Sequence, residues 1–157
     1  MSFMFNYFNS EGKMKKKLLF ITLLVSGNAL AVCPSNTKTV FSCTTANNKT
    51  IQVCDAGKSI SYSFGKASSP ELSIAVPRNR VTTYQWGGMG RNMNYTVNIP
   101  NGNTVYKVFN NVDKFDEYSA SGVEVVQNKK SLATVKCSES KKIVSNIEGI
   151  NLKNVDE

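Results

Sequence analysis

The stretch SISYSFG, residues 59–65, alternates serine with Ile60, Tyr62 and Phe64. Apolar residues at every second position indicate a β-strand with one buried and one solvated face. The same period recurs in ELSIAV (71–76), MNYTVNI (93–99) and SLATVKC (131–137). No amphipathic helix of ten or more residues is evident. We therefore predict an all-β fold, an antiparallel sandwich or small barrel of about eight or nine strands.

Turn signals separate these runs at short intervals. Asn101-Gly102 in PNGN is the strongest hairpin signal, because both residues readily adopt the positive φ that a tight turn needs. The segment QNKK, residues 127–130, predicts a second hairpin near the end of the strand pattern. The charged segment 138–157 is weakly patterned, and we expect a short helix or a frayed tail there.

The N-terminal segment has the features of a secretory signal peptide. Lys15–Lys17 form a positive region, residues 18–25 are apolar, and Ala29-Leu30-Ala31 is a small-x-small cleavage site. We expect residues 1–31 to be removed, with 1–13 an over-long start, and the rest to divide into a β domain (32–137) and the tail. The apolar run is too short to span a membrane. Cleavage near Ala31 predicts a periplasmic or secreted protein, and a lipoprotein acylated at Cys33 is the less favoured alternative.

Composition narrows the classes of partner. The chain has 19 basic and 11 acidic residues, and four of the lysines and one glutamate lie in 1–31, leaving a net charge of +5. This charge allows attraction to anionic envelope glycans, and export argues against nucleic acid. The four cysteines, Cys33, Cys43, Cys54 and Cys137, predict two disulfides in an oxidising compartment, with three possible pairings. Their spacing and the absence of histidine predict no metal site and no cofactor.

The segment YQWGGMGRNMNY, residues 84–95, holds the only tryptophan and is the first candidate site. Its glycines lack the spacing and the following helix of a phosphate-binding loop. In one interpretation Trp86 caps the core and the glycines relieve strain. In the other, Trp86, Tyr84 and Arg91 form a binding tip for a sugar ring or a protein cleft. Arg78 and Arg80, the only other arginines, lie close in sequence and favour the second interpretation.

Catalysis is not expected. Without histidine, no Ser-His-Asp or Cys-His unit can form, and oxidised cysteines are not nucleophiles. The closest acidic group, Asp113, Asp116 and Glu117, is typical of a solvated loop. We predict a binding protein and not an enzyme.

Several stretches, among them SPELSIAVPR, TYQWGGMGR and ATVKC, resemble small exported Gram-negative bacterial proteins of unassigned activity. A weaker resemblance is to the periplasmic or membrane-bound inhibitors of c-type lysozyme, which are eight-stranded barrels. In that family an early Tyr/Phe-x-Cys is bridged to a late cysteine, which implies pairing of Cys43, in Phe41-Ser42-Cys43, with Cys137. The family's Ser-x-Ser-Gly loop enters the lysozyme cleft, and SASG here, at Ser119, Ser121 and Gly122, is similar to it.

These observations lead to two expectations of function. The first is an exported binding protein similar to lysozyme inhibitors, with a loop at Ser119–Gly122 or Trp86–Arg91 inserted into a protein cleft. The alternative is a cell-envelope structural or glycan-binding module, held by Arg78, Arg80, Arg91 and the lysines.

Overall fold

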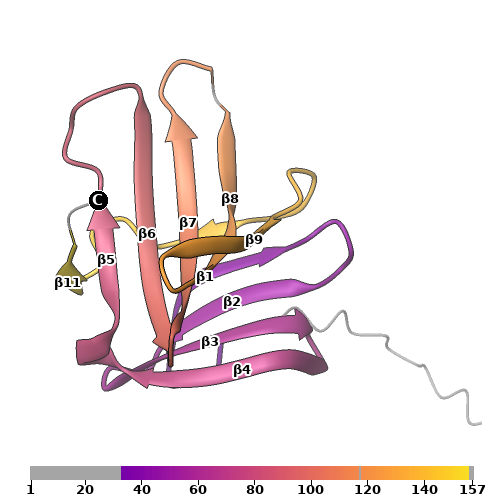
Figure 1. Ribbon diagram of the computed structural model, residues 1–157. Coiled ribbons are helices and arrows are strands. Elements are labelled where there is room, and N and C mark those ends of the chain that lie inside the picture. Colours follow the sequence, from indigo (N-terminus) through magenta and orange to yellow (C-terminus); the bar gives the residue numbers. More distant parts are fainter. Residues whose placement is uncertain (1–32, 117, 156–157) are drawn as a thin grey trace, which may run out of the picture.

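A computed structural model describes residues 33–116 and 118–155 (Figure 1). The predicted signal peptide, residues 1–31, lies outside the described residues. Nine strands of four or more residues and two shorter ones are described, together with a three-residue 3-10 helix. Their bounds are β1 Lys38–Thr44, β2 Thr50–Asp55, β3 Ser59–Lys66, β4 Ser69–Pro77, η1 Arg78–Arg80, β5 Thr82–Gln85, β6 Asn92–Asn101, β7 Thr104–Asp113, β8 Ser119–Gln127, β9 Lys130–Lys136, β10 Val144–Ser145 and β11 Lys153–Asn154.

The strands form two sheets and no closed barrel, so the fold is a β-sandwich. One sheet has the order β10-β1-β2-β3-β4 and the other the order β11-β5-β6-β7-β8-β9. Every neighbouring pair is antiparallel except β11 with β5. The all-β prediction from the alternating sequence is confirmed.

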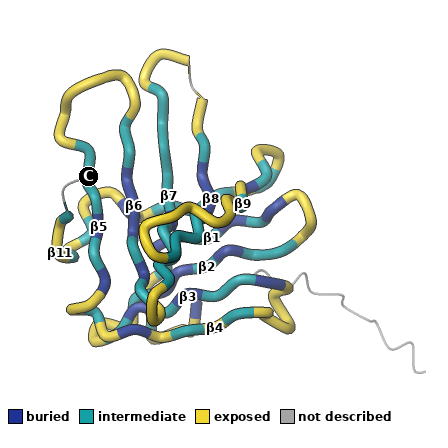
Figure 2. The backbone as a smooth tube through the Cα atoms, in the orientation of Figure 1, coloured by how far each residue is buried: buried dark blue, intermediate teal, exposed yellow. Residues whose placement is uncertain are grey.

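The two sheets cross at a steep angle, and the core lies where they overlap (Figures 1 and 2). Ile60 and Tyr62 of the SISYSFG strand are buried at 0% and 1% exposure, as their period requires. The Tyr62 ring stacks on Tyr106 of the opposite sheet, with ring centroids 4.9 Å apart. The upper parts of β6 and β7 and the loops beyond them extend past the smaller sheet (Figure 1).

Both predicted hairpins are present, the first with a small difference. Asn101 pairs with Thr104, so the turn residues are Gly102 and Asn103, and Gly102 has a φ of 62°. The turn is thus centred one residue later than the Asn101-Gly102 signal predicted. In the QNKK hairpin, Asn128 and Lys129 have φ values of 49° and 64°, which is the conformation of the tight turns that suit twisted strands.

The cysteines form two disulfides, Cys33–Cys54 and Cys43–Cys137. Cys33 and Cys54 lie 21 residues apart in sequence, and Cys43 and Cys137 lie 94 apart. The second bridge connects β1 of one sheet to the residue after β9 of the other. Because its sulfur is bonded to Cys54, Cys33 has no thiol to acylate.

The expectation of a short helix or a frayed end for residues 138–157 is wrong for its described part. This segment adds β10 to the edge of one sheet and β11 to the edge of the other. Ile147, between them, is completely buried, and Ile150 and Leu152 pack against the core. The apolar residues of this segment pack between the edges of the two sheets and follow no single period in sequence. Their spacing therefore did not predict strands.

Candidate functional site

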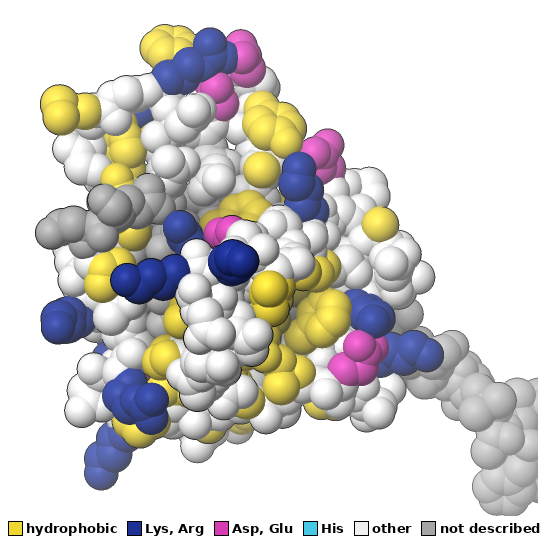
Figure 3. All heavy atoms as spheres, in the orientation of Figure 1, with side chains coloured by type: hydrophobic (Ala, Val, Ile, Leu, Met, Phe, Trp, Pro, Cys, Tyr) yellow, Lys and Arg dark blue, Asp and Glu magenta, His cyan; other side chains and the backbone are white. Residues whose placement is uncertain are grey.

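Two loops meet at one end of the six-stranded sheet. The connection from β5 to β6 and the connection from β7 to β8 emerge there because all four strands are antiparallel neighbours. The pair Asn92–Asp113 closes the β6–β7 ladder at the base of the loops. Residues 86–91, 114–116 and 118 of these connections are called the loop tip below; they lie at the top of Figure 1. In Figure 3 apolar, basic and acidic side chains are adjacent at this end.

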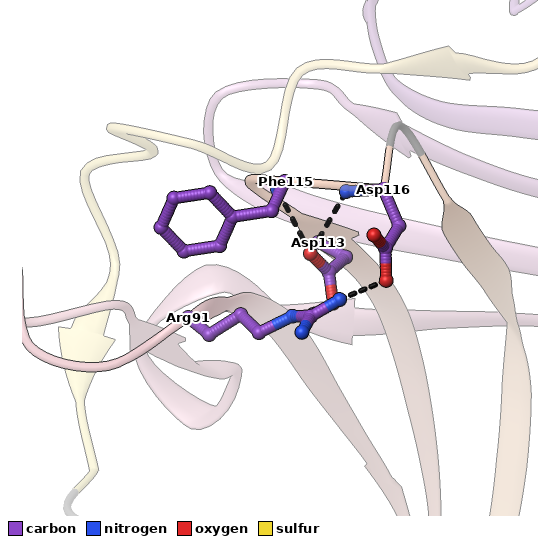
Figure 4. A network of polar contacts seen from close by, with 4 residues as sticks. All are labelled: Arg91, Asp113, Phe115 and Asp116. Carbon is purple, nitrogen blue, oxygen red and sulfur yellow. Dashed lines mark hydrogen bonds and ion pairs between the residues drawn. The ribbon is translucent and has the colours of Figure 1, made fainter.

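Arg91 holds the two loops together (Figure 4). Its Nε donates to Asp113 Oδ2 at 2.6 Å, and its Nη2 donates to Asp116 Oδ2. The other oxygen of Asp113 accepts the backbone N–H groups of Phe115 at 2.9 Å and Asp116 at 3.2 Å. The hydrogen bond from Arg91 lowers the pKa of Asp113 below its ordinary value, and the Phe115 N–H lowers it further. The Arg91 guanidinium is therefore occupied by two carboxylates of the protein itself.

Trp86 also connects the loops. It is half-buried and packs against the core, and its Nε1 donates to the Met89 carbonyl at 2.7 Å. The Lys114 ammonium lies 3.7 Å from the centre of the Trp86 ring, a cation–π contact. These contacts match the interpretation in which the ring caps the core and fixes the loop.

Sequence reasoning missed the most exposed apolar residues of the loop tip. Met89, Phe115 and Tyr118 are 88%, 75% and 52% exposed. Among the described residues the only other large apolar side chain this exposed is Leu132 on β9, at 58%. Three of four such residues thus gather at one end, on loops fixed by ion pairs. In the sequence, Phe115 and Tyr118 lie directly beside the acidic residues of VDKFDEY, residues 112–118. We interpreted that segment only as a solvated loop.

The SASG segment does not form a loop. Ser119, Ser121 and Gly122 lie in β8, and Ser121 is buried at 4% exposure with its Oγ donating to Asn110 Oδ1 at 2.7 Å. Gly122 faces the other side of the same strand. The expected loop at Ser119–Gly122 is therefore wrong, since these residues continue the pairing of β8 with β7. Tyr84 lies on β5 opposite Thr96, two residues before the loop tip begins, and strand β6 separates it from the β7–β8 connection.

The three arginines do not cluster in space. Arg78 and Arg80 lie in η1, which precedes β5, whereas Arg91 lies in the loop at the other end of that strand (Figure 1). Arg78 is paired with Asp55 and donates to the Asn151 carbonyl at 2.8 Å. Burial raises the pKa of Asp55, but hydrogen bonds from Arg78 and the Gly57 N–H outweigh burial and lower the pKa overall.

No protein-family model, curated protein or solved structure matches the chain. Within residues 33–116 and 118–155, no helix is long and apolar enough to cross a membrane. The class that the fold defines is a disulfide-bonded β-sandwich that presents two coupled loops at one end.

Proposed function

We propose that the protein is an exported binding protein that inserts its loop tip into the active-site cleft of a lysozyme and blocks it. The observation that carries this proposal is the exposure of Met89, Phe115 and Tyr118 on two loops that Arg91 ties together. Exposed apolar side chains gathered at a projecting end favour a concave partner, because they stay in water until a cleft covers them.

The expected energetics suit a tight complex. Complete burial of one such side chain contributes about 1.5–3 kcal/mol. Because the ion pairs and the Trp86 contacts already order the loops, little conformational entropy remains to be lost on binding. Arg91 and Lys114 offset the charges of Asp113 and Asp116, and Glu117 leaves the two connections with a net charge of only −1, so complex formation should depend only weakly on salt.

The choice of a lysozyme as the partner comes from the sequence resemblance. The Cys43–Cys137 bridge supports it, because this pairing is the one that the resemblance implied. With SASG placed in a strand, the inserted element becomes the loop tip, and Ser119, Ser121 and Gly122 have no direct part in it.

The test is retention of lysozyme on the immobilised, oxidised protein. We expect the triple variant Met89→Ser, Phe115→Ser and Tyr118→Ser to lose at least tenfold in affinity, because each side chain contributes more than a factor of ten when buried. Leu132→Ser is the matched control, since Leu132 on β9 is 58% exposed, within the range of the three loop-tip residues, and this variant should bind as wild type does. Failure of the wild type to retain lysozyme, or equal losses in both variants, would exclude the proposal.

A second candidate, a module for anionic envelope glycans, is favoured by a basic groove at the opposite end. Lys58, Arg78 and Lys153 line a groove of about 640 Å³ with Asn79 and Asn151. Such binding would weaken steeply as salt rises. Co-sedimentation with cell-wall material that disappears in Lys58→Ser/Lys153→Ser, and not in the loop-tip variant, would favour this function over the first.

A further inference from the structure

A second groove lies on the face of the six-stranded sheet that points away from the smaller sheet. Val97, Val108 and Val123 pair across β6, β7 and β8 and face the core, with exposures of 0%, 0% and 1%. Their neighbours in each strand point to the opposite face, because side chains alternate along a strand. On that face lies a groove of about 290 Å³, called the outer groove, lined by Asn94, Thr96, Lys107, Phe109, Asn111, Glu124 and Thr134.

The position of Gly122 explains why this face is hollow. Gly122 is the cross-strand partner of Phe109, so a side chain there would stand beside the Phe109 ring. A Cβ at Gly122 would lie 2.2 Å from the Val135 carbonyl oxygen and 3.0 Å from Lys136 Cα, which is closer than real contacts allow. Strand β9 therefore curls in over β8 at this point, and glycine allows the close approach. Thr134 of β9, the cross-strand partner of Glu124, also lines the outer groove.

Four of the polar side chains that line the outer groove are not used by the described part of the protein. Among the described residues, the side chains of Asn94, Asn111, Glu124 and Thr134 have no hydrogen-bond partner, although Asn94 and Asn111 are half-buried. Each amide offers two donors and one acceptor. Half-buried polar groups are normally paired with protein or water, so this set is ready to bind a polar ligand.

The combination of groups indicates which ligand would fit. Phe109 gives a flat apolar surface in the middle of the outer groove, and the amides of Asn94 and Asn111 lie together one step along the ladder, as cross-strand partners. Lys107 and Glu124 contribute one charge of each sign, so the groove has no net charge to attract an anion. A sugar ring has the matching surface, because its hydroxyl groups lie around an apolar face of C–H groups.

We propose that the outer groove binds a neutral sugar of one or two rings. The ring packs on Phe109, and its hydroxyl groups exchange hydrogen bonds with Asn94, Asn111 and Thr134. The volume is at the lower end of the range of about 300–1,000 Å³ typical of ligand pockets, which limits the ligand to a short saccharide. This site is separate from the loop tip, so it does not depend on the lysozyme proposal.

The test is an NMR titration of the oxidised protein with cellobiose, maltose and the N-acetylglucosamine disaccharide. Each sugar is added to a concentration of roughly 10 mM, which is ten times a dissociation constant of about 1 mM. A sulfated heparin disaccharide is the anionic comparison. We expect saturable shifts of the Asn94 and Asn111 side-chain amides with at least one neutral sugar. Phe109→Ala and Asn111→Asp should weaken that binding at least tenfold, whereas Phe115→Ala, an exposed phenylalanine in the loop tip, should leave it unchanged.

Three outcomes would overturn the proposal. They are no saturable shift with any neutral sugar, binding that Phe109→Ala leaves intact, and binding of the heparin disaccharide alone. Asn111→Asp keeps the size and shape of the side chain, so its effect does not depend on whether Phe109→Ala weakens the fold. The near-ultraviolet circular dichroism of each variant reports its folding. Loss of lysozyme binding in Phe115→Ala with retained sugar binding would show that the two sites act separately.

Discussion

Removing each disulfide in turn gives a prediction whose size follows from the structure. In the chain-entropy account, a cross-link stabilises the fold by restricting the unfolded chain, and the effect grows with the length of the closed loop. The bridge Cys43–Cys137 closes a separation of 94 residues, and Cys33–Cys54 closes one of 21. The same relation gives about 4.7 kcal/mol for the first and about 3.3 kcal/mol for the second.

The variants are Cys43→Ala/Cys137→Ala and Cys33→Ala/Cys54→Ala, unfolded in urea without reductant and followed by circular dichroism. All four cysteines are buried, so each pair loses similar packing and the difference of about 1.4 kcal/mol reflects loop length. We expect the first variant to be the less stable and its m value to rise more, since its unfolded chain exposes more surface. Equal losses, or a larger loss for the second variant, would contradict the pairing or the reasoning from loop length.

Three further substitutions test other parts of the structure by urea unfolding. Asp113→Asn should lower stability at neutral pH, because the hydrogen bond from Arg91 depresses the pKa of Asp113 in the folded protein. The stability that ionised Asp113 contributes is present above the ordinary pKa of 3.8 and disappears as the pH falls through the folded-state pKa. The stabilities of wild type and variant should therefore converge in acid. Gly122→Ala should cost about 1–3 kcal/mol because its Cβ meets the backbone of β9, whereas Gly87→Ala, with open space around it, should change little. Ile147→Ala should cost about 2–5 kcal/mol, since the side chain is completely buried, and an unchanged midpoint would show that this segment is not part of the core.

The fold was predictable where local pattern and tertiary structure agree. Ile60 and Tyr62 alternate with serines in sequence, and the structure buries them against the opposite sheet. The hairpin at Gly102 was predictable because turn geometry depends on a few adjacent residues. The spacing of the cysteines did not predict their pairing, because the pairing depends on which strands become neighbours after folding; only the family resemblance implied the Cys43–Cys137 bridge.

The candidate site was less accessible from sequence. Trp86 and Arg91 were found because the segment that holds them combines the only tryptophan with three glycines and an arginine. Their role as supports for the loops depends on Asp113 and Lys114, which lie on another connection. The SASG segment carries loop-forming residue types, yet pairing with β7 makes it a strand. The aromatic residues beside the acidic ones in VDKFDEY were the only local sign of the exposed Phe115. The unpaired amides of the outer groove leave no local signal, because they meet only when β6 and β7 pair.

The central claim, that the loop tip acts by entering a lysozyme cleft, is tested most directly by titrating lysozyme activity with the oxidised protein. Wild type and Leu132→Ser should abolish activity near an equimolar ratio, with little change between low and high salt. The Met89→Ser/Phe115→Ser/Tyr118→Ser variant should need at least a tenfold excess. Full lysozyme activity in a large excess of the wild-type protein would contradict the claim.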